Sequence, residues 1–177
     1  MLARKEAFAA RAEATELQVL HCADQLLMAM VGPVCIALWQ TKPTPALFEI
    51  QRTHLNAAVA NNPGKVSFMC VVEGKAEPPD EAERKASAAM ITSLGADLFG
   101  VACVVESQGF RAAITRTVLS GVLFLVRSPA PIKLFDNVPV AAHWLSRCAG
   151  SGVPLELPSL VERGRSLLTA QRDLLTR

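Results

Sequence analysis

The residues best placed for chemistry lie in the stretch VVEGKAEPPDEAERKAS, residues 71–87. It reads as the end of a buried strand, a short loop and the start of a helix, the junction where open α/β folds usually bind ligands. Asp80 and Glu83 form a D-x-x-E pair, which resembles a capping box with Asp in place of Ser or Thr. Basic residues precede Ser87, as in a kinase site, but Ser87 lies about two turns into the predicted helix. We therefore expect a helix cap at Asp80, and we favour a structural role for Ser87.

A second candidate is the stretch ESQGFRAAITR, residues 106–116. Ser107 and Gly109 precede a predicted helix that has Arg111 in its first turn. Free backbone N–H groups at a helix start attract anions, and Arg111 adds positive charge. The sequence predicts a small anion site here, although it has no Gly-rich phosphate loop.

The predicted helix after Thr44 carries two polar residues, Gln51 and His54, inside its apolar arc. Such a pair either lines a ligand cavity or lies at the rim of the sheet with its hydrogen bonds satisfied. We favour the second interpretation, because buried polar groups are usually paired.

The five cysteines give no sign of a disulfide framework or a metal site, because their number is odd and no two lie within three residues. Cys35, Cys70 and Cys103 fall in apolar, strand-like runs, where cysteine behaves as a small hydrophobe. No G-x-S-x-G, H-E-x-x-H or P-loop pattern occurs. We expect no cofactor, no metal and no enzymatic activity.

The amino-acid composition argues against several classes of partner and location. The 177 residues are 51% hydrophobic and 19% charged, with a net charge of +2, which is too mild to indicate nucleic-acid binding. The longest apolar run, residues 118–126, is far shorter than the roughly 20 residues of a membrane-spanning helix. The charged N-terminus does not resemble a secretory signal. We expect a soluble protein in the reducing cytoplasm.

Hydrophobic periodicity and breakers define the elements. Strands are expected at 17–21, 25–31, 33–39, 65–72, 98–106 and 132–135. Helices are expected at 2–16, 45–60, 81–94, 110–125, 139–148 and 158–175. This order predicts an α/β fold, in which a mixed sheet of about six strands has helices packed on it.

That order, with these contents, resembles the STAS domain (sulfate transporter and anti-sigma-factor antagonist), in a divergent branch related to the SEC14-like fold. The segments that carry the resemblance are LLMAMVGPVCIALW, KVSFMCVV, VACVVESQGFRAAITR and IKLFDNVPVAAHWL. The resemblance implies a STAS-like domain at 17–149, an N-terminal helical extension at 1–16, and a linker with a C-terminal amphipathic helix at 150–177.

The resemblance also implies a position for a phosphorylation switch. Family members that have one carry Ser or Thr in the loop after the central strand, which maps to residues 74–81. That stretch contains no hydroxyl, and Asp80 stands roughly at the family's phosphoacceptor position. We therefore expect this position not to be phosphorylated.

The C-terminal helix carries an apolar stripe that repeats every seven residues, formed by Leu160, Val161, Leu167, Leu168, Leu174 and Leu175. A single amphipathic helix of this length must bury its stripe. It packs either on its own domain or on another chain, as a homodimer or with a protein partner, and the sequence leaves both open.

These observations favour a non-enzymatic, STAS-like regulatory or scaffold protein that acts by protein–protein docking. The alternative is a carrier of a lipid or another small apolar ligand. A carrier needs a cavity of about 300 Å³ or more between sheet and helices.

Overall fold

The computed structural model describes residues 16–23, 26–41, 44–64, 66–73, 80–94, 97–106, 113, 116–117, 120–121, 126, 128–148 and 152–175. The predicted helix over 2–16, apart from its last residue, and most of the predicted helix over 110–125 lie outside these residues.

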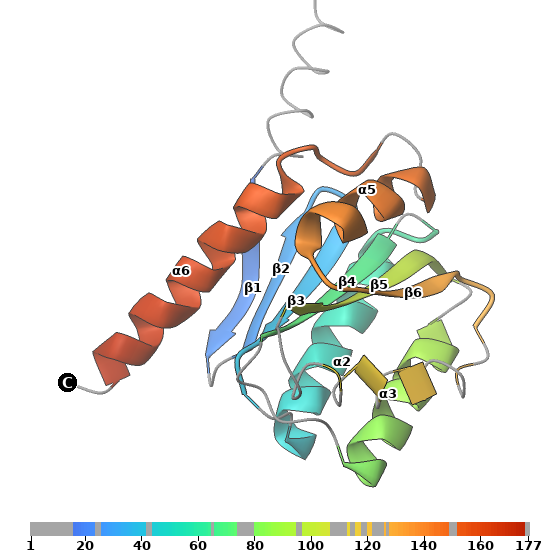
Figure 1. The fold of residues 1–177 in the computed structure, drawn as a ribbon, viewed down its shortest axis with the longest axis horizontal. Coiled ribbons are helices and arrows are strands. Elements are labelled where there is room, and N and C mark those ends of the chain that lie inside the picture. Colours follow the sequence, from blue (N-terminus) through green and yellow to red (C-terminus); the bar gives the residue numbers. More distant parts are fainter. Residues whose placement is uncertain are drawn as a thin grey trace, which may run out of the picture.

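One mixed sheet forms the centre of the molecule (Figure 1). Its strands follow the chain in order: β1 (Gln18–Ala23), β2 (Leu26–Val31), β3 (Val34–Trp39), β4 (Val66–Glu73), β5 (Leu98–Glu106) and β6 (Ile132–Phe135). The first three are antiparallel neighbours, and β3 to β6 are parallel. The predicted α/β class with a six-stranded mixed sheet is confirmed.

Four helices cover the two faces of the sheet: α2 (Pro45–Asn61), α3 (Glu81–Leu94), α5 (Val138–Cys148) and α6 (Leu157–Leu175). Helices α2 and α3 pack on one face, and α5 and α6 pack on the other (Figure 1). This layering explains why β4 and β5 read as continuous apolar runs, since both of their faces are buried.

Local signals place the elements largely where the sequence predicts them. Gly32 has a φ of 53°, a conformation that favours glycine, in the turn that joins β2 to β3. The Thr44 hydroxyl accepts a hydrogen bond from the Leu47 N–H at 3.3 Å, with Pro45 at the first helical position.

Two boundaries differ from the prediction. β1 continues through Cys22 and Ala23, which the sequence assigns to a turn, because both residues still pair with β2. Helix α5 begins at Val138 and not at Pro139, because the Asn137 side chain caps it and accepts a hydrogen bond from the Val140 N–H at 2.9 Å.

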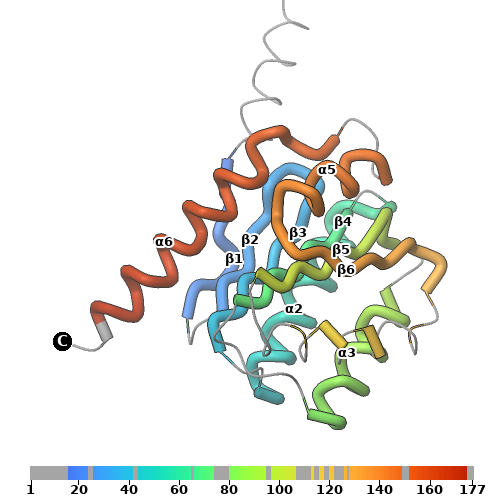
Figure 2. Tube along the Cα trace, in the orientation of Figure 1, coloured from blue at the N-terminus to red at the C-terminus, as the bar shows by residue number. Residues whose placement is uncertain are grey.

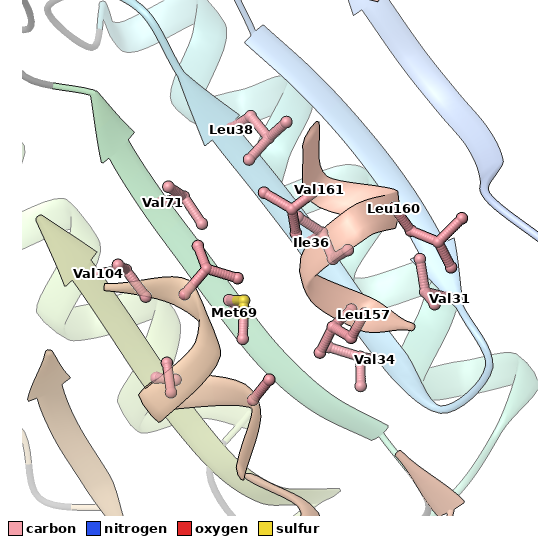
Figure 3. Packing of buried hydrophobic residues seen from close by; sticks show 14 of the residues in the cluster. Val31, Val34, Ile36, Leu38, Met69, Val71, Val104, Leu157, Leu160 and Val161 are labelled. Carbon is pink, nitrogen blue, oxygen red and sulfur yellow. The ribbon is translucent and has the colours of Figure 1, made fainter. Parts of the chain in front are cut away.

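The C-terminal helix belongs to the hydrophobic core. Leu157, Val161 and Leu168 are at most 1% exposed and pack with Ile36, Leu38 and other residues of the sheet (Figure 3). Helix α6 contacts β1, β2 and α5, and its tube runs alongside β1 (Figure 2). The structure shows that Leu160, Val161 and Leu168 of the stripe pack on their own domain.

Candidate functional site

The carboxyl ends of two neighbouring parallel strands carry the same four residues, Cys-Val-Val-Glu, at 70–73 in β4 and 103–106 in β5. The register of the strands pairs each residue with its counterpart and ends with Glu73 beside Glu106. Side chains alternate between faces along a strand. Both glutamates therefore point to the face covered by α5 and α6, as Val71 and Val104 do.

Arg165 of α6 reaches this pair of carboxylates. Its Nε donates to Glu73 Oε1 at 3.1 Å, one terminal nitrogen bonds Glu106 and the other bonds Glu162 of the same helix. The Arg165 side chain is only 20% exposed, and those of Glu73 and Glu106 are 25% and 24% exposed. An ion pair shielded to this degree is worth more than one on the open surface.

Glu106 also fixes the start of α5. Its Oε1 accepts a hydrogen bond from the Val138 N–H at 2.9 Å, at the amino end of that helix, where negative charge is favourable. One carboxylate thus joins β5, α5 and α6. We call Glu73, Glu106 and Arg165 the strand-end cluster.

The charges of the strand-end cluster favour the attachment of α6 to the sheet and do not favour proton transfer. Burial lowers the pKa of Arg165, but Glu106, Glu162 and Glu73 together raise it by more, so the net shift is upward. An arginine held in this way stays charged at any physiological pH. The arrangement can fasten α6 to the sheet, and it offers no group poised for general acid–base catalysis.

The sequence analysis missed this cluster, although it singled out the segment that begins at Val71. The signal was present in the repeated Cys-Val-Val-Glu, because identical strand ends in parallel neighbours place the glutamates side by side. No comparable signal distinguished Arg165 from the other arginines of α6.

The Asp80 interpretation is supported by the geometry of α3. The Glu83 N–H donates to Asp80 Oδ1 at 3.0 Å, and the Asp80 N–H donates to Glu83 Oε2 at 2.7 Å. This reciprocal pair is a capping box. The predicted anion site at Ser107, Gly109 and Arg111 lies outside the described residues.

The predicted interaction stripe divides into two parts. Leu160, Val161 and Leu168 are at most 9% exposed, so the sheet already occupies these side chains. Leu167 and Leu174 remain 40% and 72% exposed. The side chain of Leu175 lies outside the described residues.

The polar pair of α2 consists of one buried and one half-buried side chain. Gln51 is 3% exposed, and its Oε1 accepts a hydrogen bond from the Trp39 indole at 2.9 Å, while its Nε2 contacts the Met90 sulfur at 3.6 Å. His54 is half-buried with its ring centroid 5.9 Å from that of His21, and burial, followed by His21, lowers its pKa. Gln51 has hydrogen-bond partners, as the favoured interpretation expects, but it is buried and does not lie at the rim of the sheet.

The buried thiols are far from reactive. Burial raises the pKa of Cys35 to about 12 and that of Cys103 to about 12. Burial, and then its neighbour Cys103, raises the pKa of Cys70 well above its usual value. Since the thiolate is the nucleophile and the metal ligand, these residues act as core side chains.

Two structural features are not formed by the described residues. No group of three or more His, Cys, Asp or Glu side chains is arranged to hold a metal ion among them. Within the same part of the chain, no helix combines the length and apolarity needed to cross a bilayer.

No protein-family profile matches the sequence, and no curated protein is significantly similar to it. Among solved structures, the fold is similar to that of an uncharacterised protein of the DUF3478 family from Shewanella loihica, described as having a SpoIIAA-like fold. The similarity covers 73% of this chain and 92% of that one, at 14% identity and a TM-score of 0.43.

The architecture of this chain follows from its own strand order and pairing. The chain is an α/β domain with the mixed six-stranded sheet expected of a STAS-like fold.

Proposed function

We propose that this chain is a non-enzymatic docking module, which binds a protein partner along the outer flank of α6 and the neighbouring edge of the sheet. The observation that carries the proposal is the exposure of Leu167 and Leu174. These residues remain 40% and 72% exposed on a helix whose inner face is already buried.

The direction in which Arg165 points shows which way the exposed flank of α6 faces. Arg165 points toward β4 and β5, where its carboxylate partners lie. Leu167 follows two residues later, about 200° further around the helix. It therefore faces away from β4 and toward the β1 edge of the sheet.

Edge strand β1 adds to this surface. Val19 pairs with Ala29, a residue of the core on the α6 side, and is 41% exposed. We call Val19, Leu167 and Leu174 the β1-side strip. An apolar strip beside a sheet edge is a typical surface for a second protein.

The strip favours one kind of partner. Leucines seven residues apart match the spacing of an amphipathic helix that packs lengthwise on α6. Arg163 is exposed and lies about 40° from Leu167 around the helix, so it borders the strip with positive charge. The partner that fits is an amphipathic helix with an acidic margin.

Two observations support docking over the alternatives. The strand-end cluster and the capping box hold their carboxylates in fixed pairs, and the buried thiols are kept protonated. Among the described residues, the groove beside α5 has a volume of about 140 Å³, which is less than the roughly 300 Å³ that a carrier of small ligands needs. Docking is therefore the function that these side chains favour.

The test begins with a photo-crosslinking amino acid placed at position 174, with position 166 as control. Ser166 is exposed on the outer face of the same helix. The captured partner is then purified, and its affinity is measured for wild type, Leu174→Glu and Ser166→Glu. We expect the first substitution to weaken binding by at least about tenfold, because a buried charge replaces an apolar contact, and the second to leave it unchanged. Equal affinities for all three proteins would refute the proposed surface.

A further inference from the structure

A second surface lies at the amino end of α6, next to helix α5. Helix α5 and residues 153–158 form a groove of about 140 Å³. Its α5 wall consists of Pro139, Ala142, His143 and Ser146. Leu155 stands at the rim and is 92% exposed, the most exposed of the large hydrophobic side chains in the described residues.

The volume of the groove is comparable to that of a small apolar side chain. A cavity of about 150 Å³ accepts a molecule the size of benzene, so this groove has room for one leucine side chain. Leu155 cannot fill its own groove while it projects into solvent. Leu155 and the groove lie on the same patch of surface. A two-fold axis beside this patch therefore places Leu155 of each copy in the groove of the other.

The charges around the patch are complementary. Exposed Arg147 lies one turn after His143 on the groove side. Exposed Glu156 directly follows Leu155 on the projecting side. When two copies exchange their leucines, Glu156 of one copy approaches Arg147 of the other. This favours a second copy of the chain over an unrelated partner, since one patch supplies both halves of each contact.

We infer that the chain forms a weak, reciprocal homodimer in which Leu155 of each copy occupies the α5 groove of the other. The contact is small, so the dimer is transient, with a Kd of about 10 μM or weaker. It does not use the β1-side strip, and it leaves that strip free for the partner proposed above.

The experiment is sedimentation velocity on the full chain from about 1 μM to about 1 mM. Wild type is expected to shift reversibly from monomer to dimer as its concentration rises. Leu155→Glu abolishes the shift, whereas Leu174→Glu, on the β1-side strip, leaves it intact. Glu156→Arg and Arg147→Glu each weaken the dimer by about tenfold or less, and combining them restores it, because the exchanged charges attract again.

Three results would overturn the inference. They are a wild type that stays monomeric throughout, a dimer lost in Leu174→Glu but kept in Leu155→Glu, and a double charge reversal that does not restore association. None of the three decides the partner surface on α6, which is tested separately by crosslinking.

Discussion

At the scale of single residues, Arg165 and Glu106 are the members of the strand-end cluster that join the most helices and strands. Glu106 reaches the amino end of α5 and the guanidinium of α6 from the end of β5. The sequence predicted the capping box at Asp80 because capping residues lie three apart in the chain. It could not predict Arg165 with Glu73, because these residues are 92 positions apart.

Removing the guanidinium leaves two carboxylates side by side without the cation that pairs with both of them. Arg165→Met retains most of the apolar stem, and we expect it to lower the free energy of unfolding by about 2–4 kcal/mol at neutral pH. Urea denaturation checks the value. Glu162→Gln is the control: it removes the most exposed partner of Arg165 and should cost less than about 1 kcal/mol. Equal effects from both would mean that the strand-end cluster contributes no more than a surface ion pair.

The buried thiols make the free energy of unfolding fall with rising pH in the alkaline range. The pKa of Cys35 and that of Cys103 are about 12 in the folded chain, against 9.0 for an unperturbed thiol. Above pH 9 the unfolded chain loses these protons and the folded chain keeps them, so stability is full below pH 9 and falls toward pH 12. We expect a loss of roughly 1 kcal/mol per pH unit for each thiol, measured by denaturation. Cys35→Ala should make the slope shallower, and an unchanged slope would show that Cys35 is not the cause.

At the scale of elements, α6 shows what periodicity can and cannot predict. The seven-residue repeat predicted the helix and its apolar stripe, and α6 begins within one residue of the expected start. The repeat could not tell which surface the stripe would meet, because the sheet and a second helix accept the same leucines. In the structure the stripe packs against the apolar face of β2 and β3, formed by residues such as Leu27 and Leu38.

The surroundings of Gly164 show how closely α6 packs on the sheet. A Cβ at this position would lie 2.9 Å from Leu38 Cδ1, too near for an undisturbed core. Gly164→Ala gains about 1 kcal/mol of helix propensity but overpacks the interface, so we expect a net loss of about 1 kcal/mol or more in thermal or urea unfolding. Ser166→Ala, on the exposed face of α6, should be neutral or slightly stabilising. A stabilising Gly164→Ala would mean that α6 is not held this closely to the sheet.

At the scale of the whole molecule, the described residues form a three-layer domain, and the exposed apolar residues among them include those of the β1-side strip and Leu155. The order of strands and helices was predictable because each has a clear period and clear breakers. The strand-end cluster and the groove beside α5 were not, since both arise only when distant segments meet. The proposed docking function rests on the β1-side strip, which includes Leu167 and Leu174, the described residues of the C-terminal stripe that remain exposed.

Hydrogen exchange of the full chain with and without its crosslinked partner tests this account most directly. The predicted result is slower exchange at the amides of β1 and of the last turns of α6, with little change in α2 and α3 on the far face. Protection confined to α2 and α3, or none at the β1 edge, would contradict it.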